Sequence, residues 1–265
     1  NGRDMVTINV DSTEEYGLDT YYTTLEDFLD DCNNENIVIF DLGSEEEIFR
    51  GDKYDIPDEV KDLIFVSFDS PNELSVNLSD YEGDSDKNTV INPTNHTYFN
   101  LSGHKAATIL DHKLMMHCSN YTPVAEGSIP TGEIATVKGT PFDFTDWKVI
   151  GDEIDTDCEQ LNLTGGYDHN FVVDGCDGSV KEIAKAKSDV TGIELTVLTD
   201  LPRVQFYAGN SIDNEKGKDG AVYTKRTGFC LETQYYPNAV NTPEFPSCVF
   251  GDDTEYDSVT VYRFE

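Results

Sequence analysis

The chain has 265 residues, which is enough for one large or two ordinary domains with a buried hydrophobic core. Its 52 acidic and 18 basic residues give a net charge of -34, and a negative field of this size repels nucleic acid and anionic lipid. No segment approaches the roughly 18 consecutive apolar residues that a membrane span needs. The composition therefore predicts a protein that neither binds nucleic acid nor inserts into a membrane.

The first 70 residues are divergent and acidic, and they predict one short helix. Their apolar residues recur at i, i+3, i+4 and i+7 from position 25, and Thr23 followed by Glu26 has the spacing of a capping box. The helix is therefore expected over residues 23–32. An apolar, β-branched run predicts a strand at 36–40.

Further along, short alternating or β-branched runs separated by turn residues predict a series of strands. These runs lie at 62–68, 73–79, 108–115, 133–137, 171–173, 193–198, 204–208, 229–233 and 258–264. Beyond the first helix, no stretch keeps a 3.6-residue period over three turns. Many short strands, with 14 Tyr and 14 Phe to fill an interior, predict an all-β sandwich. We expect a single sandwich domain over residues 1–265.

The sequence gives no sign of a metal or cofactor site. The six cysteines are scattered without a Cys-x-x-Cys pair, and the nearest approach to a calcium loop, at 84–88, lacks the Gly and Glu that such a loop requires. The glycine-rich motifs that bind phosphate or dinucleotides are absent as well. We therefore expect neither a metal nor a cofactor.

Two of the five histidines stand out by their setting. His96 and His169 both fall in polar segments that are followed by aromatic residues, and we expect these segments to be loops, where functional sites gather. The remaining histidines, in or beside predicted strands, are expected to be structural or exposed.

Glu232 is the clearest local contradiction in the chain, because it interrupts an apolar strand. Strict alternation places it on one face with Cys230 and Gln234, and that face is either solvent-exposed or the lining of a pocket. In a pocket, burial would raise the pKa of the carboxyl group and suit it to act as a general base.

Several collinear motifs resemble the aldose 1-epimerases, the galactose mutarotase family, over roughly residues 73–265. The motifs are Asn-His-Thr-Tyr-Phe-Asn-Leu at 95–101, Gly-Tyr-Asp-His-Asn-Phe at 166–171, Val-Gln-Phe-Tyr-Ala-Gly-Asn at 204–210 and the segment 228–241 around Leu-Glu-Thr-Gln. Collinear blocks of this kind are more specific than any one of them.

The resemblance implies a β-supersandwich of the galactose mutarotase type that interconverts the α and β anomers of free hexoses without cofactor or metal. By motif, Glu232 would be the general base and His96 the general acid. Asp168 and Gln205 match positions that hold sugar hydroxyls, and Tyr98 matches a residue that lines the cleft.

The chain also departs from the family pattern. Family members usually carry upstream an Asn-Arg pair and a Leu-His-Gly-Gly motif, and neither occurs in residues 1–90. The alternative is therefore a non-catalytic, mutarotase-like protein with a sugar-binding, structural or assembly role. The compartment stays open, because an epimerase suits the cytoplasm, whereas disulfide-bonded cysteines would indicate a secreted protein.

Overall fold

The structure is a computed structural model that describes residues 64–67, 75–83, 85–217, 220–251 and 254–265. The predicted helix at 23–32 and the predicted strand at 36–40 lie outside these ranges. Among the described residues, no helix is long and apolar enough to cross a membrane.

The chain divides into two compact units, residues 1–82 with 257–265, and residues 83–256. The described strands that belong mainly to the first unit are β1 (Ile64–Ser67), β2 (Ser75–Gly83) and β16 (Tyr256–Phe264), in the order β1-β2-β16. β1 and β2 are antiparallel. The single sandwich domain over residues 1–265 stays a prediction.

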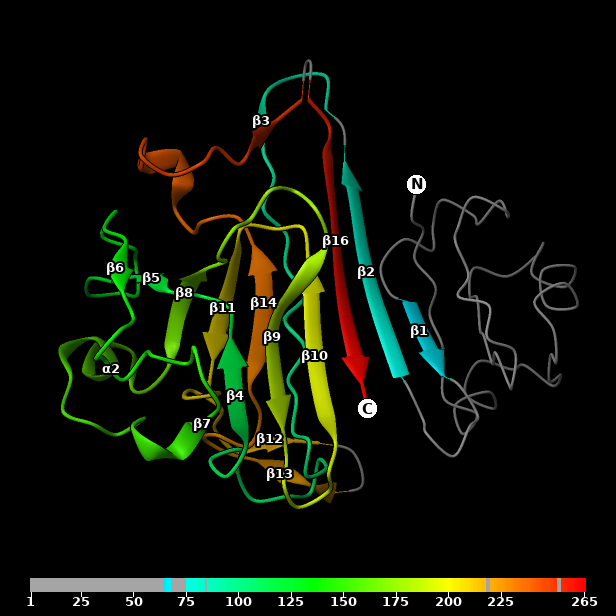
Figure 1. Cartoon of the computed structure of the whole chain (residues 1–265), viewed down its shortest axis with the longest axis vertical. Helices are drawn as coiled ribbons and strands as arrows, with labels where there is room; N and C mark the ends of the chain where they lie inside the picture. The colour runs from blue at the N-terminus through cyan, green and yellow to red at the C-terminus, as the bar shows by residue number, and fades with distance from the viewer. Residues whose placement is uncertain (1–63, 68–74, 84, 218–219, 252–253) are drawn as a thin grey trace, which may run out of the picture. The chain divides into compact units, whose positions relative to one another are not determined.

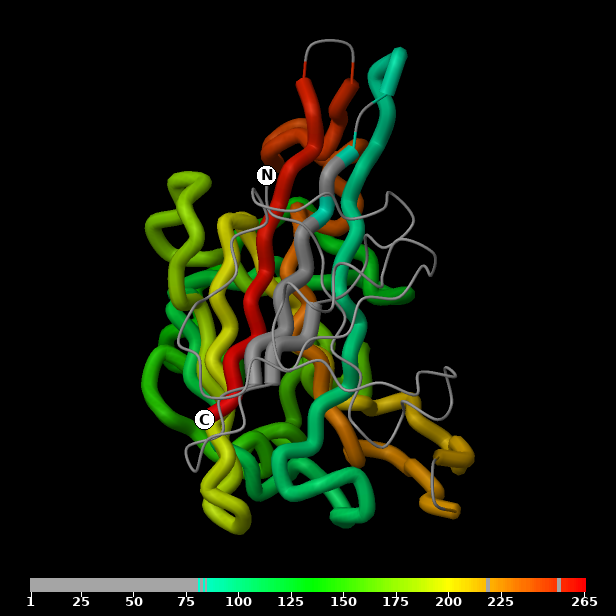
Figure 2. Tube along the Cα trace, turned by 90° about the vertical axis from the view of Figure 1, so that its right-hand side faces the viewer, coloured from blue at the N-terminus to red at the C-terminus, as the bar shows by residue number. Residues whose placement is uncertain are grey.

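The second unit is built from two antiparallel sheets. One contains β10 (Glu194–Thr199), β9 (Lys181–Lys187), β4 (Lys113–Met116) and β7 (Lys148–Val149), in that order. The other has the order β14 (Cys230–Gln234), β11 (Arg203–Tyr207), β8 (Asp168–Val172), β5 (Asn120–Thr122) and β6 (Ala135–Thr136). In Figures 1 and 2, β10 (yellow) and β14 (orange) run lengthwise in separate layers.

Short elements complete this unit. Two two-stranded ribbons pair β12 (Glu215–Lys216) with β13 (Val222–Tyr223) and β15 (Val249–Phe250) with β3 (Thr89–Val90). The described helical segments are α2 (Glu159–Thr164) and the 3-10 turns Ile150–Asp152 and Ala239–Asn241. Strands therefore make up most of the regular secondary structure of the described residues, which confirms the predicted all-β class.

Complementary side-chain sizes fill the core of this unit. In the first sheet, Ala186 on β9 lies opposite Leu114 on β4 and Leu195 on β10, and all three are buried. The second sheet contributes two large buried rings on one of its faces, Phe171 on β8 and Phe206 on β11. Small residues on a central strand leave volume for rings from a facing sheet, and dense packing of this kind fixes the strands that carry the site.

Most predicted strands within the described residues are present with bounds shifted by a few residues. The elements that were missed include the helix α2, the strand β9 and six strands of two or three residues, namely β3, β5, β7, β12, β13 and β15. β9 was missed because its sequence, Lys-Glu-Ile-Ala-Lys-Ala-Lys, alternates lysine with alanine and has little hydrophobic contrast. α2 was missed because six residues are too few to establish a helical period.

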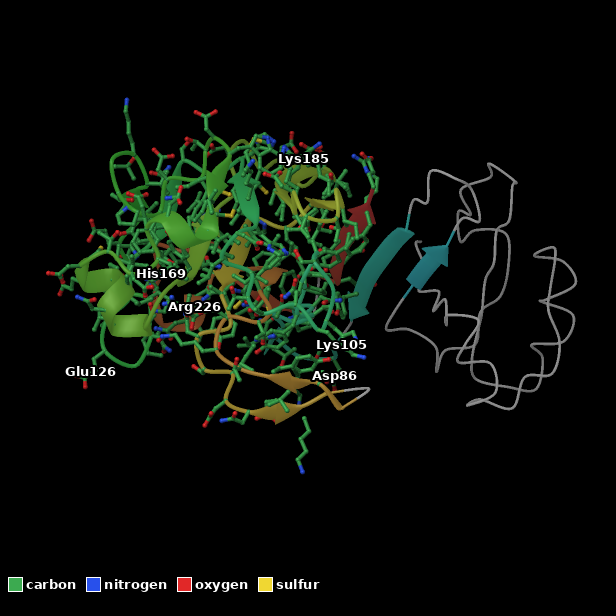
Figure 3. All side chains as sticks on the ribbon, turned by 90° about the horizontal axis from the view of Figure 1, so that it is seen from below. Asp86, Lys105, Glu126, His169, Lys185 and Arg226 are labelled. Carbon is green, nitrogen blue, oxygen red and sulfur yellow. The ribbon has the colours of Figure 1, made fainter. Side chains whose placement is uncertain are left out.

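The prediction that His169 lies in a loop is wrong. It lies inside β8, fully buried, with its ring centroid 4.5 Å from that of Phe142. Figure 3 shows His169 well inward of Glu126, which projects at the edge. Because burial lowers the pKa of His169 to about 3, its imidazole is neutral and structural.

Candidate active site

The loop at residues 92–103 is held against the start of β14 by main-chain hydrogen bonds. The N–H of Phe99 donates to the carbonyl of Phe229 at 2.8 Å, and the reverse bond measures 3.0 Å. At His96 itself, the Asn95 side-chain oxygen accepts a hydrogen bond from the N–H of Thr97 at 3.0 Å, which closes a tight turn around His96. The loop therefore has a fixed path and presents His96 over β14.

Strand register places a row of polar side chains on one face of the second sheet. Gln205 on β11 lies directly opposite Glu232 on β14 and opposite Asn170 on β8, and Asn170 lies opposite Thr122 on β5. Residues opposite one another in antiparallel strands point to the same face. This polar row, defined as Thr122, Asn170, Gln205 and Glu232, forms part of a pocket wall.

The pocket has a volume of about 430 Å³, within the range of about 300–1,000 Å³ that is typical of small-molecule sites. All five residues that the sequence singled out line it, namely His96, Tyr98, Asp168, Gln205 and Glu232. They come from the loop and from three strands spread over more than 130 residues of sequence. The face of β14 that carries Glu232 was expected either to meet solvent or to line a pocket, and the structure shows that it lines the pocket.

His96 and Glu232 face each other at the pocket. The His96 Nε2 atom lies 3.4 Å from the Glu232 Oε1 atom, and the side chains are 49% and 9% exposed, respectively. Burial raises the pKa of Glu232 to about 7, with a further rise from the nearby Asp168 and an opposing effect of His96. A carboxyl group with this pKa exchanges its proton near neutral pH, as a general base must.

Asp168 and Gln205 form a hydrogen-bonded pair beside the first two residues. The Gln205 amide donates to a carboxylate oxygen of Asp168 at 2.7 Å. Burial raises the pKa of Asp168, while the bond from Gln205 and the proximity of His96 lower it. The Gln205 oxygen is buried without a hydrogen-bond partner, so the pair retains acceptor capacity.

The rings of Tyr98 and Tyr207 lie beside the imidazole of His96 at the pocket. The ring centroids of His96 and Tyr98 are 5.2 Å apart, and Tyr207 lies 6.1 Å from each. Burial, together with nearby acidic groups, raises the pKa of Tyr98 to about 12, so its hydroxyl stays protonated at neutral pH. The rings offer an apolar surface, and the hydroxyls offer hydrogen bonds.

The chain that leads into β8 is fixed by close backbone packing. Gly166 has a φ of +140°, and a Cβ atom there would lie 2.3 Å from the side-chain oxygen of Asn210. The Asn210 amide donates to the carbonyl of Tyr167 at 2.9 Å. Only glycine fits this approach, which sets the position of Asp168 two residues later.

The sequence did not name as site residues eight further residues that line the pocket, among them the polar residues Thr122, Asn170, Tyr207 and Gln234. Alternation along β14 had already placed Gln234 on the face of Glu232, and alternation along β11 could have found Tyr207, which follows Gln205 by two positions. Thr122 and Asn170 enter through cross-strand register, which is not visible in the sequence.

Comparison with known proteins places the chain in one family. The aldose 1-epimerase family model matches residues 35–263. The chain is 41% identical over 212 residues to the galactose mutarotase of Homo sapiens, which covers 78% of this chain and 58% of that protein. It is 33% identical over 233 residues to the aldose 1-epimerase of Escherichia coli (strain K12), covering 87% and 64%. The chain thus spans about three-fifths of the length of these relatives.

Solved structures agree with the sequence comparisons. An aldose epimerase homologue from C. elegans superposes with a TM-score of 0.63 at 27% identity, covering 77% of this chain and 58% of that one. A galactose 1-epimerase from Lactobacillus acidophilus gives 0.59 at 29% identity, covering 76% and 58%. These matches confirm the predicted β-supersandwich of the galactose mutarotase type. On the family match and the fold together, the chain belongs to the aldose 1-epimerase family.

Proposed function

We propose that this protein is an aldose 1-epimerase that interconverts the α and β anomers of free hexoses such as glucose or galactose. Glu232 removes the proton from the C1 hydroxyl, and His96 protonates the ring oxygen as the bond between C1 and that oxygen breaks. Rotation about the C1–C2 bond and the reverse proton transfers give the other anomer. Each positioned proton transfer contributes roughly 10²–10⁴-fold to the rate.

The observation that carries this proposal is the facing pair of His96 and Glu232 at one pocket. At 3.4 Å, the contact is longer than a strong hydrogen bond, so a sugar can separate the two groups at little energetic cost. The pyranose then lies with its anomeric hydroxyl toward Glu232 and its ring oxygen toward His96. Both reacting atoms belong to one acetal-like centre, which suits an acid and a base held this close together.

The remaining pocket residues fit the binding of an uncharged, hydroxyl-rich ring. Asp168 and Gln205 hold sugar hydroxyls, because their oxygens accept and the amide donates hydrogen bonds. Tyr98, which is 48% exposed, covers a face of the ring with its own aromatic face. The described residues that line the pocket include neither Lys nor Arg, which favours a neutral sugar over a phosphorylated one.

Polarimetry of freshly dissolved α-glucose or α-galactose tests the proposal. The protein should accelerate the approach to anomeric equilibrium above buffer alone at neutral pH. Because the base must be ionised, kcat/KM should fall about tenfold for each pH unit below the Glu232 pKa of about 7. No acceleration over matched buffer, with sugar binding retained, would replace this proposal with the non-catalytic, sugar-binding alternative.

A further inference from the structure

Cys230 lies beneath the proposed acid and base and takes no part in the reaction described above. Its sulfur is 3.4 Å from the His96 Nδ1 atom, while the other ring nitrogen, Nε2, makes the 3.4 Å contact with Glu232. Cys230 and Glu232 are alternate residues of β14 and therefore share a face. One ligating atom from each of the three side chains lies within 4.8 Å of the other two.

Two of the three side chains lie at fixed positions on a strand, and the third lies on an exposed loop. Cys230 and Glu232 are buried on β14, the end strand of its sheet, and pairing with β11 fixes their positions. His96 lies in a loop and its side chain is 49% exposed, so its ring can rotate to present either nitrogen to a cation. Solvent also reaches the cluster from the His96 side, which gives a cation an entry path.

Electrostatics at the cluster favour a cation. Asp168 interacts with both Glu232 and His96, and it adds a further negative charge beside them when ionised. The whole chain carries a net charge of -34, which raises the local concentration of cations near its surface.

We propose that His96, Cys230 and Glu232 form a binding site for a soft divalent cation of the zinc class, and that this cation competes with the sugar. One nitrogen, one sulfur and one oxygen ligand, with a water molecule in the fourth position, match the tetrahedral preference of Zn²⁺. Mg²⁺ and Ca²⁺ prefer oxygen ligands and do not use a thiolate. On binding, Zn²⁺ bonds to the sulfur, and the thiol proton leaves to the buffer.

The consequence for activity rests on the proposed function, whereas the binding does not. A cation bound by His96 and Glu232 withdraws the acid and the base together, so zinc should inhibit competitively with sugar. By linkage, bound sugar should weaken zinc binding by the same factor by which zinc weakens sugar binding. The epimerase would then respond to the concentration of free zinc.

Titration of the full chain with Co²⁺, a spectroscopic substitute for Zn²⁺, tests the site without any assay of activity. We expect a thiolate-to-cobalt absorption band that Zn²⁺ abolishes and Mg²⁺ does not. Cys230→Ser should remove the band, whereas Cys176→Ser, at an exposed thiol outside the cluster, should leave it unchanged. His96→Ala, at the exposed position, should weaken Co²⁺ binding by at least about 100-fold, since even outer partners of a metal ligand contribute 10–100-fold.

Three outcomes would overturn the metal site: no band, a band that survives in Cys230→Ser, or a band lost in Cys176→Ser. Circular dichroism of each variant checks that it is folded. If Co²⁺ binds through Cys230 but the wild-type protein does not accelerate anomer exchange, the metal site stands and the proposed function fails. If exchange is catalysed and is unaffected by Zn²⁺ at concentrations that saturate the Co²⁺ site, the regulatory part of the inference is wrong.

Discussion

Replacing Glu232 with Gln should lower kcat/KM for anomer exchange by about 10²–10⁴-fold, the usual contribution of a positioned general base. The amide has nearly the shape of the carboxylate but cannot accept the C1 hydroxyl proton. The pocket and its hydrogen-bond geometry should otherwise persist, so the loss should fall mainly on kcat rather than on sugar affinity.

Stability measurements on the same variant separate a catalytic loss from unfolding. The pKa of Glu232 is raised by burial from an ordinary value of 4.5 to about 7, so its ionised form opposes folding. This cost is absent below about pH 4.5 and is complete above about pH 7. Relative to the wild type, Glu232→Gln should therefore gain stability as pH rises, by up to about 3 kcal/mol.

The matched control for this variant is Glu215→Gln, at an exposed position on β12 away from the pocket. It should keep wild-type activity and show no comparable gain in stability. Full activity in Glu232→Gln would exclude the carboxylate as the base, and a variant that is less stable at pH 8 than at pH 4, relative to the wild type, would contradict its assigned ionisation.

Replacing His96 with Ala should lower kcat by about 10²–10³-fold, because the ring oxygen then takes its proton from water rather than from a positioned imidazole. The His96 side chain is 49% exposed, so its truncation should leave the fold intact. The cavity left behind opens to solvent, and added imidazole should enter it and restore part of the activity.

The control for this second variant is His117→Ala. The His117 side chain is 48% exposed and contacts Glu182 at 3.5 Å, outside the pocket. It should retain full activity with no response to imidazole. Equal losses in the two variants, or a loss in His96→Ala that imidazole does not relieve, would argue that His96 acts through structure rather than as an acid.

Local patterns in the sequence were sufficient to predict the fold class. Alternation and turn residues indicated most strands, because each one-sided strand shows its buried face directly. They missed β9, whose buried face is built from alanines that differ little from a polar background. They also placed His169 in a loop, since a polar segment with glycines before it looks like a loop until cross-strand pairing is known.

The site was predictable in identity but not in arrangement. Alternation placed Glu232 and Gln234 on one face without showing what that face meets. In the structure, strand register places Gln205 beside Glu232 on the neighbouring strand. The loop brings His96 to Cys230, which is 134 residues away in the sequence. Such contacts depend on the pairing of distant segments, which no local pattern records.

The most direct test of the central claim, that His96 and Glu232 act as one acid/base pair, is the rate of anomer exchange in the double variant His96→Ala/Glu232→Gln. Groups that act in the same step give strongly non-additive losses. The account predicts that the double variant is no slower than Glu232→Gln alone, within about threefold. Losses that multiply would show two independent contributions and would contradict it.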